Sequence, residues 1–324
     1  MKTLDLIIPL FNEAEHLAAN LAAIRSVARE IPGVECRLLL VDDGSTDGTV
    51  AAAQAFCEHH PETALVCLNR NYGKEAAIQA GLVNATGDGV VVMDSDLQHP
   101  PELLPDMVRL WLAGMPLVEA CRASRGYESR LRRVLALGFY RFFERVSGFN
   151  LQNQTDFKLL DRSVVEAYLQ LPEHRRFFRG LLVWMGIPGA RLPFEVPRSA
   201  RSSRWSLWRM FVLSVEAITS FSTVPLHLIT VSGVVTLLGS GVLGGTVLYQ
   251  KFSGRAVDGF TTVIGLQLFL GSLLMVGLGL IGIYIGRIYE EIKRRPGFMV
   301  NREASRLTPK KARNVARPGS RRSE

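Results

Sequence analysis

The chain has few cysteines and no motif that would use them. Its four cysteines all lie within the first 121 of 324 residues, and none forms a C-x-x-C pair. This pattern excludes a disulfide scaffold and a zinc ribbon, and it predicts buried thiols in a reducing compartment. With 48% apolar and 21% charged residues, the chain is also neither disordered nor fibrous.

Residues 1–286 lack a net charge, so the formal charge of +8 lies in the last part of the chain. The segment 287–324 contains 12 basic and four acidic residues. A neutral body that ends in a basic segment argues against a nucleic-acid partner and favours a membrane surface.

Two long segments near the C-terminus lack any Asp, Glu, Lys or Arg, namely His227–Gln250 and Thr261–Gly286. Each exceeds the roughly 20 apolar residues that cross about 30 Å of hydrocarbon as a helix. We therefore expect two transmembrane helices, with a pair of buried core helices as the alternative. By the positive-inside rule, the basic segment stays in the cytoplasm. Two spans return the chain to the side on which it began, so the N-terminal part is expected in the cytoplasm too. The expected location is the cell (inner or plasma) membrane, as a multi-pass protein.

Short apolar runs alternate with helical patterns in the first 120 residues. This alternation predicts an α/β domain with a mostly parallel sheet that is covered on both faces. The expected strands are 4–9, 37–41, 64–68, 90–93 and 117–120, and the expected helices between them include 49–58, 74–83 and 101–112.

Polar clusters follow the first four of these strands. In parallel sheets the ligand lies beyond the carboxyl ends of the strands, so one crevice should collect all four clusters. Each cluster alone is also compatible with an ordinary turn. The clusters are Asn12-Glu13, Asp42-Asp43, Asn69–Lys74 and Asp94-Ser95-Asp96.

The last cluster has the composition of a metal site. Asp94 and Asp96 are two residues apart, and Gln98 offers a further oxygen. Mg²⁺ or Mn²⁺ prefers such oxygens and takes few protein ligands when a diphosphate supplies the rest. The spacing fits a metal that bridges a nucleotide diphosphate and stabilises its departure, with a structural turn as the alternative. Asp42 or Asp43, together with Glu13, would then reach the base and ribose, because their carboxylates would repel the phosphates.

Four motifs together resemble glycosyltransferase family 2: Ile8–Glu13, Val41–Asp47, Arg70–Ala77 and Met93–Gln98. With the two apolar segments, the chain is similar to the polyprenyl-phosphate glycosyltransferases of that family, such as dolichyl-phosphate mannose synthase and the bactoprenol glucosyltransferases. The resemblance implies a Rossmann-like GT-A fold, a homo-oligomer (a tetramer), and a role in cell envelope glycan biosynthesis.

The activity that the resemblance implies is an inverting transfer of one sugar from a nucleotide-sugar to a lipid phosphate. UDP-glucose and undecaprenyl phosphate are the first expectation. GDP-mannose with dolichyl phosphate, or an amino-arabinose donor, stays open.

The resemblance also implies roles for individual residues. The catalytic residues would be Asp156, Asp96 and Arg204. A family loop that closes over the phosphates keeps two cations here, Arg198 and Arg204, although Arg201 and Trp205 depart from its pattern; a solvated basic loop is the alternative. By position, the nucleoside would be held by Pro9, Phe11, Glu13, Val41 and Asp43. The metal would be ligated by Asp94, Asp96 and Gln98, with Asp94 and Ser95 beside the ribose or the metal. Arg122 would lie near the donor, and Asp156 would lie near the acceptor phosphate.

The chemistry of the acceptor limits what Asp156 must do. A phosphate monoester has a second pKa near 6, so at neutral pH it is mostly deprotonated already. We expect Asp156 to position the acceptor, or a metal, rather than to act as an indispensable base. The arginines at 175, 176 and 179 would offset the repulsion between two phosphorylated substrates.

Two amphipathic segments precede the apolar ones. Basic residues and an aromatic-aliphatic stripe at 129–149 predict an interfacial helix, and packing on the protein's own core is the open alternative. The predicted organisation begins with a cytoplasmic GT-A domain at 1–205 and a juxtamembrane helix at 206–225. Two membrane helices follow at 226–250 and 261–286, and a short non-cytoplasmic loop at 251–260 joins them. The chain ends in a basic, partly disordered cytoplasmic tail at 287–324.

Two other functions fit the sequence less well. A processive polysaccharide synthase would need more than two spans and a Q-x-x-R-W-type motif, which the chain lacks. An inactive membrane scaffold or a flippase partner would not need the intact acidic set.

Overall fold

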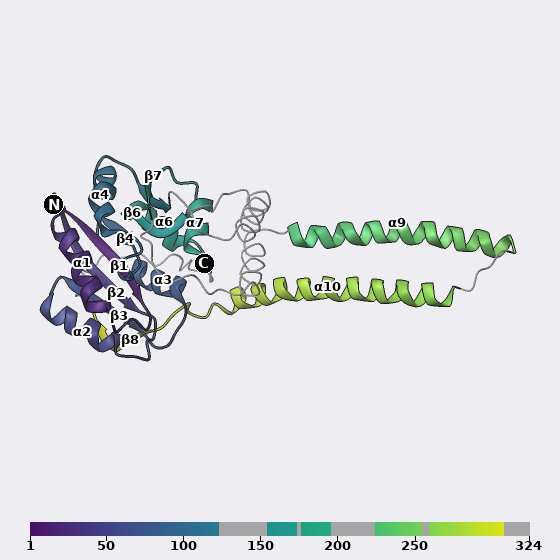
Figure 1. Cartoon of the computed structure of the whole chain (residues 1–324), viewed down its shortest axis with the longest axis horizontal. Coiled ribbons are helices and arrows are strands. Elements are labelled where there is room, and N and C mark those ends of the chain that lie inside the picture. Colours follow the sequence, from purple (N-terminus) through teal and green to yellow (C-terminus); the bar gives the residue numbers. More distant parts are fainter. Residues whose placement is uncertain (123–153, 174–175, 196–223, 255–258, 308–324) are drawn as a thin grey trace, which may run out of the picture. The chain divides into compact units, whose positions relative to one another are not determined.

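The computed structural model describes residues 1–122, 154–173, 176–195, 224–254 and 259–307 (Figure 1). They belong to two compact units. One unit contains an eight-stranded sheet and is built from three separate parts of the chain, and the other contains two long apolar helices. The predicted helix at 129–149 lies outside the described residues, as does the predicted juxtamembrane helix up to residue 223.

The sheet is mixed, with the order β7-β5-β6-β4-β1-β2-β3-β8. β4, β1, β2 and β3 run parallel, whereas β6 runs antiparallel to both β4 and β5 and β8 runs antiparallel to β3. The predicted mostly parallel α/β sheet is confirmed. The strands are β1 (Lys2–Leu10), β2 (Val34–Asp42), β3 (Thr63–Leu68), β4 (Gly89–Val92), β5 (Leu117–Arg122), β6 (Gln154–Asp161), β7 (Gly189–Phe194) and β8 (Val300–Arg306).

Helices cover both faces of the sheet because its central strands are apolar on both sides. Alternate residues of β1 face α1 and α4, which pack in one core cluster with α2. On the opposite face α3 lies so close to β1 that a Cβ on Gly81 would be 2.4 Å from Ile7. The helices of this unit are α1 (Leu17–Arg29), α2 (Thr49–His59), α3 (Lys74–Asn84), η1 (Pro101–Leu103), α4 (Leu104–Leu112), α6 (Arg162–Gln170) and α7 (Phe178–Trp184).

The last described strand, β8, comes from the segment that the sequence assigns to a basic tail. It covers the outer edge of β3, and side-chain contacts from β8 itself and from α2 add to the backbone pairing. Ser305 Oγ accepts from Cys67 N at 2.9 Å, and Gln54 donates to Ala304 O at 3.0 Å. An edge strand needs backbone pairing rather than a buried apolar face, which explains why such a charged segment forms a strand.

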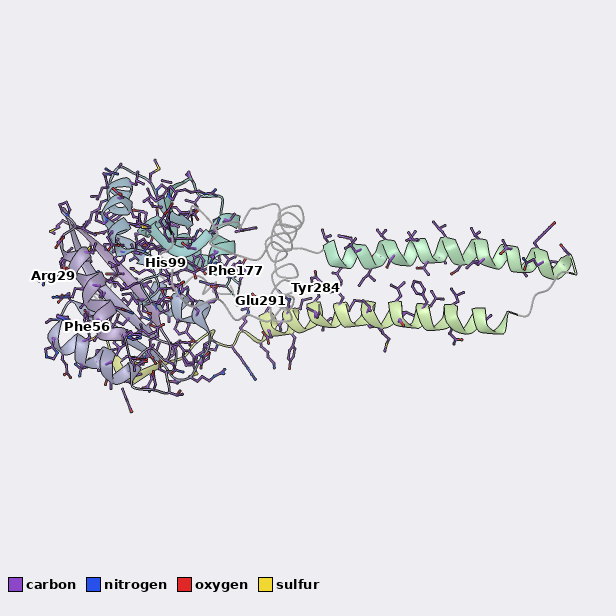
Figure 2. All side chains as sticks on the ribbon, in the orientation of Figure 1. Arg29, Phe56, His99, Phe177, Tyr284 and Glu291 are labelled. Atoms are coloured by element: carbon purple, nitrogen blue, oxygen red, sulfur yellow. The ribbon has the colours of Figure 1, made fainter. Side chains whose placement is uncertain are left out.

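The second unit consists of α9 (Val224–Phe252) and α10 (Phe260–Lys293). Each contains a 25-residue segment that is long and apolar enough to cross a membrane, Leu226–Gln250 and Phe269–Lys293. Their described side chains project outward along both helices (Figure 2), and almost none of these described residues is buried. This exposure argues against the alternative of two buried core helices.

Candidate functional site

The polar clusters meet where the order of the parallel strands changes direction, between β4, β1 and β2. Hydrogen bonds join the loops that follow these strands. Asp43 N donates to Leu10 O at 2.9 Å, and Asn12 N donates to Ser45 Oγ at 3.0 Å. Open α/β sheets bind ligands at such a switch point. The prediction that the clusters share one edge of the sheet is confirmed.

Asp43 fixes the loop that follows β3. Its two carboxylate oxygens accept backbone hydrogen bonds from Tyr72 N at 2.7 Å and Gly73 N at 2.8 Å. Gly44 permits this close approach, because a Cβ there would lie 2.3 Å from the carbonyl carbon of Arg70. Burial raises the pKa of Asp43, and the two backbone bonds oppose that rise. Asp43, which is predicted to hold a nucleoside, therefore orders the loop that follows β3.

Glu13, in the loop that follows β1, contacts the loop that follows β4. Its carboxylate accepts a short hydrogen bond from the buried Ser95 hydroxyl, and its backbone N donates to Thr49 Oγ1 at 2.8 Å. Burial raises the pKa of Glu13, and the nearby charges of Asp96 and Asp94 raise it further. The three carboxylates therefore repel one another at this point, and the Lys74 ammonium offsets part of that repulsion.

The Asp94–Gln98 segment forms a tight turn. Leu97 adopts a φ of +55°, which side-chain-bearing residues rarely do, and Gln98 N donates to Asp96 Oδ1 at 3.0 Å. Behind the turn lies the buried His99, whose Nδ1 is 3.7 Å from Asp94 Oδ2 and whose ring stacks on Phe157. Backbone strain of this kind is concentrated at functional sites.

The donor set suits a hard divalent cation, although it is sparse. Asp94, Asp96 and Gln98 provide two carboxylates and one amide, which are oxygen ligands that Mg²⁺ and Mn²⁺ prefer. Among the described residues, no cluster of three or more His, Cys, Asp or Glu could hold a metal ion. A cation here would therefore need further oxygens from a ligand such as a diphosphate.

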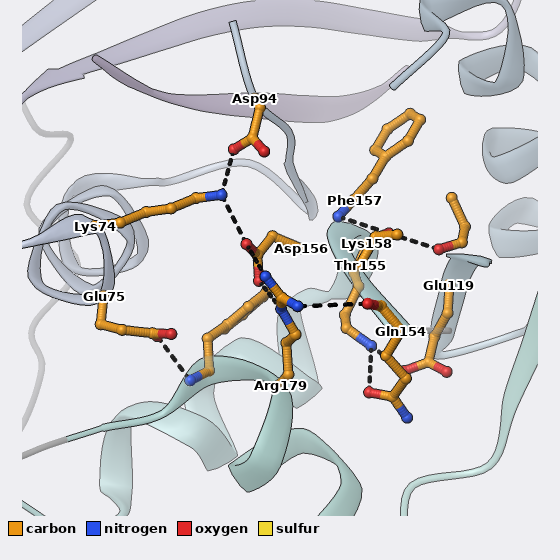
Figure 3. A network of polar contacts seen from close by, with 12 residues as sticks. Lys74, Glu75, Asp94, Glu119, Gln154, Thr155, Asp156, Phe157, Lys158 and Arg179 are labelled. Atoms are coloured by element: carbon orange, nitrogen blue, oxygen red, sulfur yellow. Dashed lines mark hydrogen bonds and ion pairs between the residues drawn. The ribbon is translucent and has the colours of Figure 1, made fainter. Parts of the chain in front are cut away.

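Lys74 links this acidic turn to Asp156 on β6 (Figure 3). Its ammonium lies 2.6 Å from Asp94 Oδ1 and 2.7 Å from Asp156 Oδ2. From α7, Arg179 forms two parallel bonds to the same Asp156 carboxylate, Nε to Oδ1 at 2.5 Å and Nη2 to Oδ2 at 2.8 Å. One buried carboxylate is thus held by two cations from separate helices.

These cations decide the protonation state of Asp156. Burial alone would raise its pKa, but the Arg179 guanidinium and the Lys74 ammonium hold the pKa well below its ordinary value. Asp156 is therefore an anion throughout the physiological range and a very weak base.

Glu75 connects the helices that carry the two cations. It follows Lys74 in the first turn of α3 and accepts a hydrogen bond from Phe178 N, at the start of α7, at 2.8 Å. Burial raises the pKa of Glu75 to about 7. The carboxyl group thus fixes the start of α7 beside the start of α3.

The remaining predicted residues are distributed around the same edge or lie outside the described part. Pro9 and Val41 are side by side in the register of β1 and β2, and Val41 is fully buried, whereas Phe11 is 43% exposed. Arg122 ends β5, opposite Phe194 of β7. The residues that lie outside the described ranges are Arg175, Arg198, Arg201, Arg204 and Trp205.

Sequence reasoning assigned no individual role to Lys74, Glu75 or His99, and it treated Arg179 only as one of three arginines. Lys74 directly follows a strand-end loop and begins a helix, a position that could have marked it as a site residue. Nothing in the sequence pairs Arg179 with Asp156, because 23 residues and a strand-to-helix connection separate them.

Comparison with known proteins identifies the family. Residues 5–169 match the model of "Glycosyl transferase family 2". The chain belongs to this family. It is a glycosyltransferase with a GT-A fold, as the four motifs predict.

Relatives of this glycosyltransferase extend over almost the whole chain. It is 34% identical to the "Prophage bactoprenol glucosyl transferase homolog" of Escherichia coli (strain K12), over 92% of this chain and 98% of that one. It is 35% identical to the "Bactoprenol glucosyl transferase" of Shigella phage SfV, over 93% of this chain and 98% of that one.

Solved structures show the same fold. Glucosyl-3-phosphoglycerate synthase from Mycobacterium tuberculosis, in complex with phosphoglyceric acid, has a TM-score of 0.50 and 23% identity. The match covers 67% of this chain and 77% of that one. At this identity the likeness establishes the fold alone.

Proposed function

We propose that this glycosyltransferase transfers a single glucose, with inversion, from UDP-glucose to a polyprenyl phosphate, most simply undecaprenyl phosphate. The product would be a lipid-linked sugar that serves as a donor in cell envelope glycan biosynthesis.

One observation carries the choice of acceptor. The relatives named bactoprenol glucosyl transferases match 92% to 93% of the chain, so the unmatched part is shorter than the 29 residues of α9. The similarity therefore includes parts of both apolar helices as well as the sheet. Helices long enough to span a membrane suit an enzyme whose acceptor is a membrane lipid.

The proposed reaction is a single displacement. An oxygen of the acceptor phosphate forms a bond to the anomeric carbon of the sugar, and the bond from that carbon to the diphosphate oxygen breaks. The acceptor phosphate is mostly a dianion at neutral pH, so the reaction needs no proton acceptor. The low pKa of Asp156 supports its role as a positioning residue rather than a general base.

The acidic turn would serve the leaving diphosphate. We propose that Asp94, Asp96 and Gln98 hold Mg²⁺ or Mn²⁺, with Ser95 and Glu13 fixing the turn. The cation would offset the charge that develops on the diphosphate. The grouping of the Glu13, Asp94 and Asp96 carboxylates supports this assignment. Arg122, Arg198 and Arg204 would bind the donor phosphates, and Pro9, Phe11, Val41 and Asp43 the nucleoside.

The membrane arrangement follows from charge. We propose that α9 and α10 both cross the inner or plasma membrane, with the sheet-containing unit and the basic segment after Gly286 on the cytoplasmic side. The loop between the helices then lies on the other side.

The test uses the full-length protein in detergent micelles with Mg²⁺ or Mn²⁺. We expect radiolabelled UDP-glucose and undecaprenyl phosphate to give one lipid-linked glucose for each UDP released. Undecaprenol, which lacks the phosphate, is the matched control acceptor. GDP-mannose and a UDP-linked amino-arabinose test the donor, and dolichyl phosphate tests the polyprenol.

Each outcome decides between the alternatives. A product formed with another sugar alone would replace UDP-glucose, and several sugars per lipid would indicate a processive synthase. No lipid-linked product with any donor would contradict the proposal and favour an inactive scaffold.

A further inference from the structure

Asp156 lies in a bulge of β6. On one side of it, Lys158 pairs with Glu119 of β5. The next pair is Gln154 with Cys121, which is four residues further along β6 but only two residues further along β5. The additional residues of β6 form the bulge, and Asp156 is at its middle. Bulges are frequent next to active sites, where they redirect a side chain.

A side chain replaces the regular backbone pairing within the bulge. The Thr155 hydroxyl donates to Ala120 O of β5 at 2.6 Å and accepts from Phe157 N at 3.2 Å. The residues before and after Asp156 are thus connected to each other and to β5. On its other side, β6 pairs with β4 only from Lys158 onward. The direction of the Asp156 side chain therefore depends on the bulge and not on a regular ladder.

The ammonium of Lys158 joins the two ends of the bulge (Figure 3). It donates to the Glu119 carboxylate of β5 and, at 3.3 Å, to Gln154 Oε1 at the start of β6. The backbone oxygen of Gln154 in turn accepts from Arg179 Nη1 at 3.4 Å. Lys158 is therefore connected, through Gln154, to the same arginine that binds Asp156.

The ion pair of Lys158 and Glu119 is enclosed. The Lys158 side chain is 0% exposed and the Glu119 side chain is 8% exposed, whereas Arg191 of β7, which lies 3.5 Å from Glu119, is 67% exposed. Burial lowers the pKa of Lys158, and the charge of Glu119 opposes that fall. A buried ion pair adds little stability compared with apolar side chains of similar volume, but it can enforce one geometry.

We propose that Lys158 is a positioning residue for sugar transfer. By joining Glu119 to Gln154, its ammonium closes the bulge of β6. The closed bulge directs the Asp156 carboxylate to its two cations. The inference rests on the proposed function for its kinetic test, whereas the geometry of the bulge is independent of that function.

The test removes both charges of the pair at once. In the double variant Lys158→Met with Glu119→Gln no buried charge is left without a partner. Thermal unfolding of the full-length protein in detergent should therefore stay within about 3 °C of the unsubstituted protein. The bridge to Gln154 is lost, so kcat/KM for undecaprenyl phosphate should fall about tenfold, because a small displacement of a site residue slows the reaction strongly. KM for UDP-glucose should stay within about twofold.

A matched control and a milder variant complete the kinetic test. Asp106→Asn with Arg109→Gln removes an exposed ion pair of α4 and should change neither kinetic constant. Gln154→Leu keeps the buried ion pair but removes the acceptor at the start of β6, and it should lower kcat/KM for undecaprenyl phosphate about fivefold. Gln154→Leu decides the question if the double variant unfolds early. An unchanged kcat/KM in whichever variant unfolds normally would overturn the proposal.

Hydrogen–deuterium exchange adds a measurement that needs no sugar donor. In the double variant, peptides that contain the amide of Phe157 should exchange about tenfold faster, and peptides of β1 should not change. Unchanged exchange at Phe157 would show that Lys158 does not hold the bulge. If no donor supports transfer but this exchange rises, the proposed function fails and the bridge across the bulge stands.

Discussion

At the scale of single residues, the site is organised by which cation meets which carboxylate. The Lys74 ammonium is a point charge that contacts both Asp94 and Asp156, whereas Arg179 donates two parallel hydrogen bonds to Asp156. The acidic members could be predicted because each follows a strand or matches a family motif. Their cationic partners could not, because the pairing of Lys74 with Asp156 spans 82 positions and exists only after the sheet has formed.

The metal assignment gives a direct prediction. Asp96→Ala should lower metal-dependent transfer by at least about a hundredfold, because the carboxylate would hold the cation that offsets the charge of the leaving diphosphate. Initial rates of glucose transfer across a Mn²⁺ titration measure this effect. Asp106→Ala, which removes a half-exposed carboxylate on α4, is the matched control. Full activity of Asp96→Ala at any Mn²⁺ concentration would overturn the assignment.

The buried Glu75 predicts how stability depends on pH. In the folded protein its pKa is raised to about 7, whereas in the unfolded chain it is about 4.3. Between these pH values the folded state binds more protons than the unfolded chain does. Glu75 therefore lowers the free energy of unfolding as pH rises from about 4.5 to 7. Glu75→Gln cannot lose a proton, and its amide oxygen can still accept from Phe178 N.

The stability of Glu75→Gln relative to the unsubstituted protein should therefore increase between pH 5 and pH 7.5. Urea unfolding in detergent at both pH values measures the difference. Glu102→Gln, at an exposed position in η1, is the control. A difference that stays constant with pH would show that Glu75 is ionised in the folded protein.

At the scale of elements, strands with a strong apolar pattern could be predicted and the others could not. The five runs in the first 120 residues correspond to β1–β5. β6 begins with three polar residues, and it buries the charge of Lys158 against Glu119. β7 is half exposed and contains a proline. β8 is polar throughout its middle, and only its pairing with β3 makes it a strand.

The contribution of β8 can be measured by truncation. A chain that ends at Arg295 keeps both apolar helices but exposes the edge of β3, and we expect its unfolding temperature to fall by at least about 5 °C. A chain that ends at Leu307 keeps β8 and should unfold like the full-length protein. Thermal unfolding of the detergent-solubilised proteins tests this. Equal unfolding temperatures for the two truncations would mean that β8 adds no stability.

At the scale of the whole molecule, the chain combines a glycosyltransferase sheet with two apolar helices. Length and lack of charge were sufficient to predict two long apolar helices, because a run of more than about 20 residues without a charged side chain favours a continuous helix. The boundary of the sheet-containing unit could not be predicted, since it includes a strand that follows the second helix. The tetramer that the resemblance implies stays a prediction.

The proposed topology can be tested with cysteines placed in a background that lacks the four native ones. Ser253→Cys, an exposed position within the predicted outer loop, should react with a membrane-impermeant maleimide in intact spheroplasts. Glu15→Cys, whose native side chain is 87% exposed, should react only after permeabilisation. Reaction of Glu15→Cys in intact spheroplasts would reverse the orientation.

The position of β8 along the chain has a consequence for biosynthesis. The ribosome delivers seven strands first, then both apolar helices, and only then the strand that covers β3. Until β8 emerges, the edge of β3 has no partner among the described strands, and such edges are prone to pair with other chains. Completion of the sheet is therefore coupled to synthesis past the second apolar helix, so a chain truncated before the end of α10 also lacks the strand that covers β3.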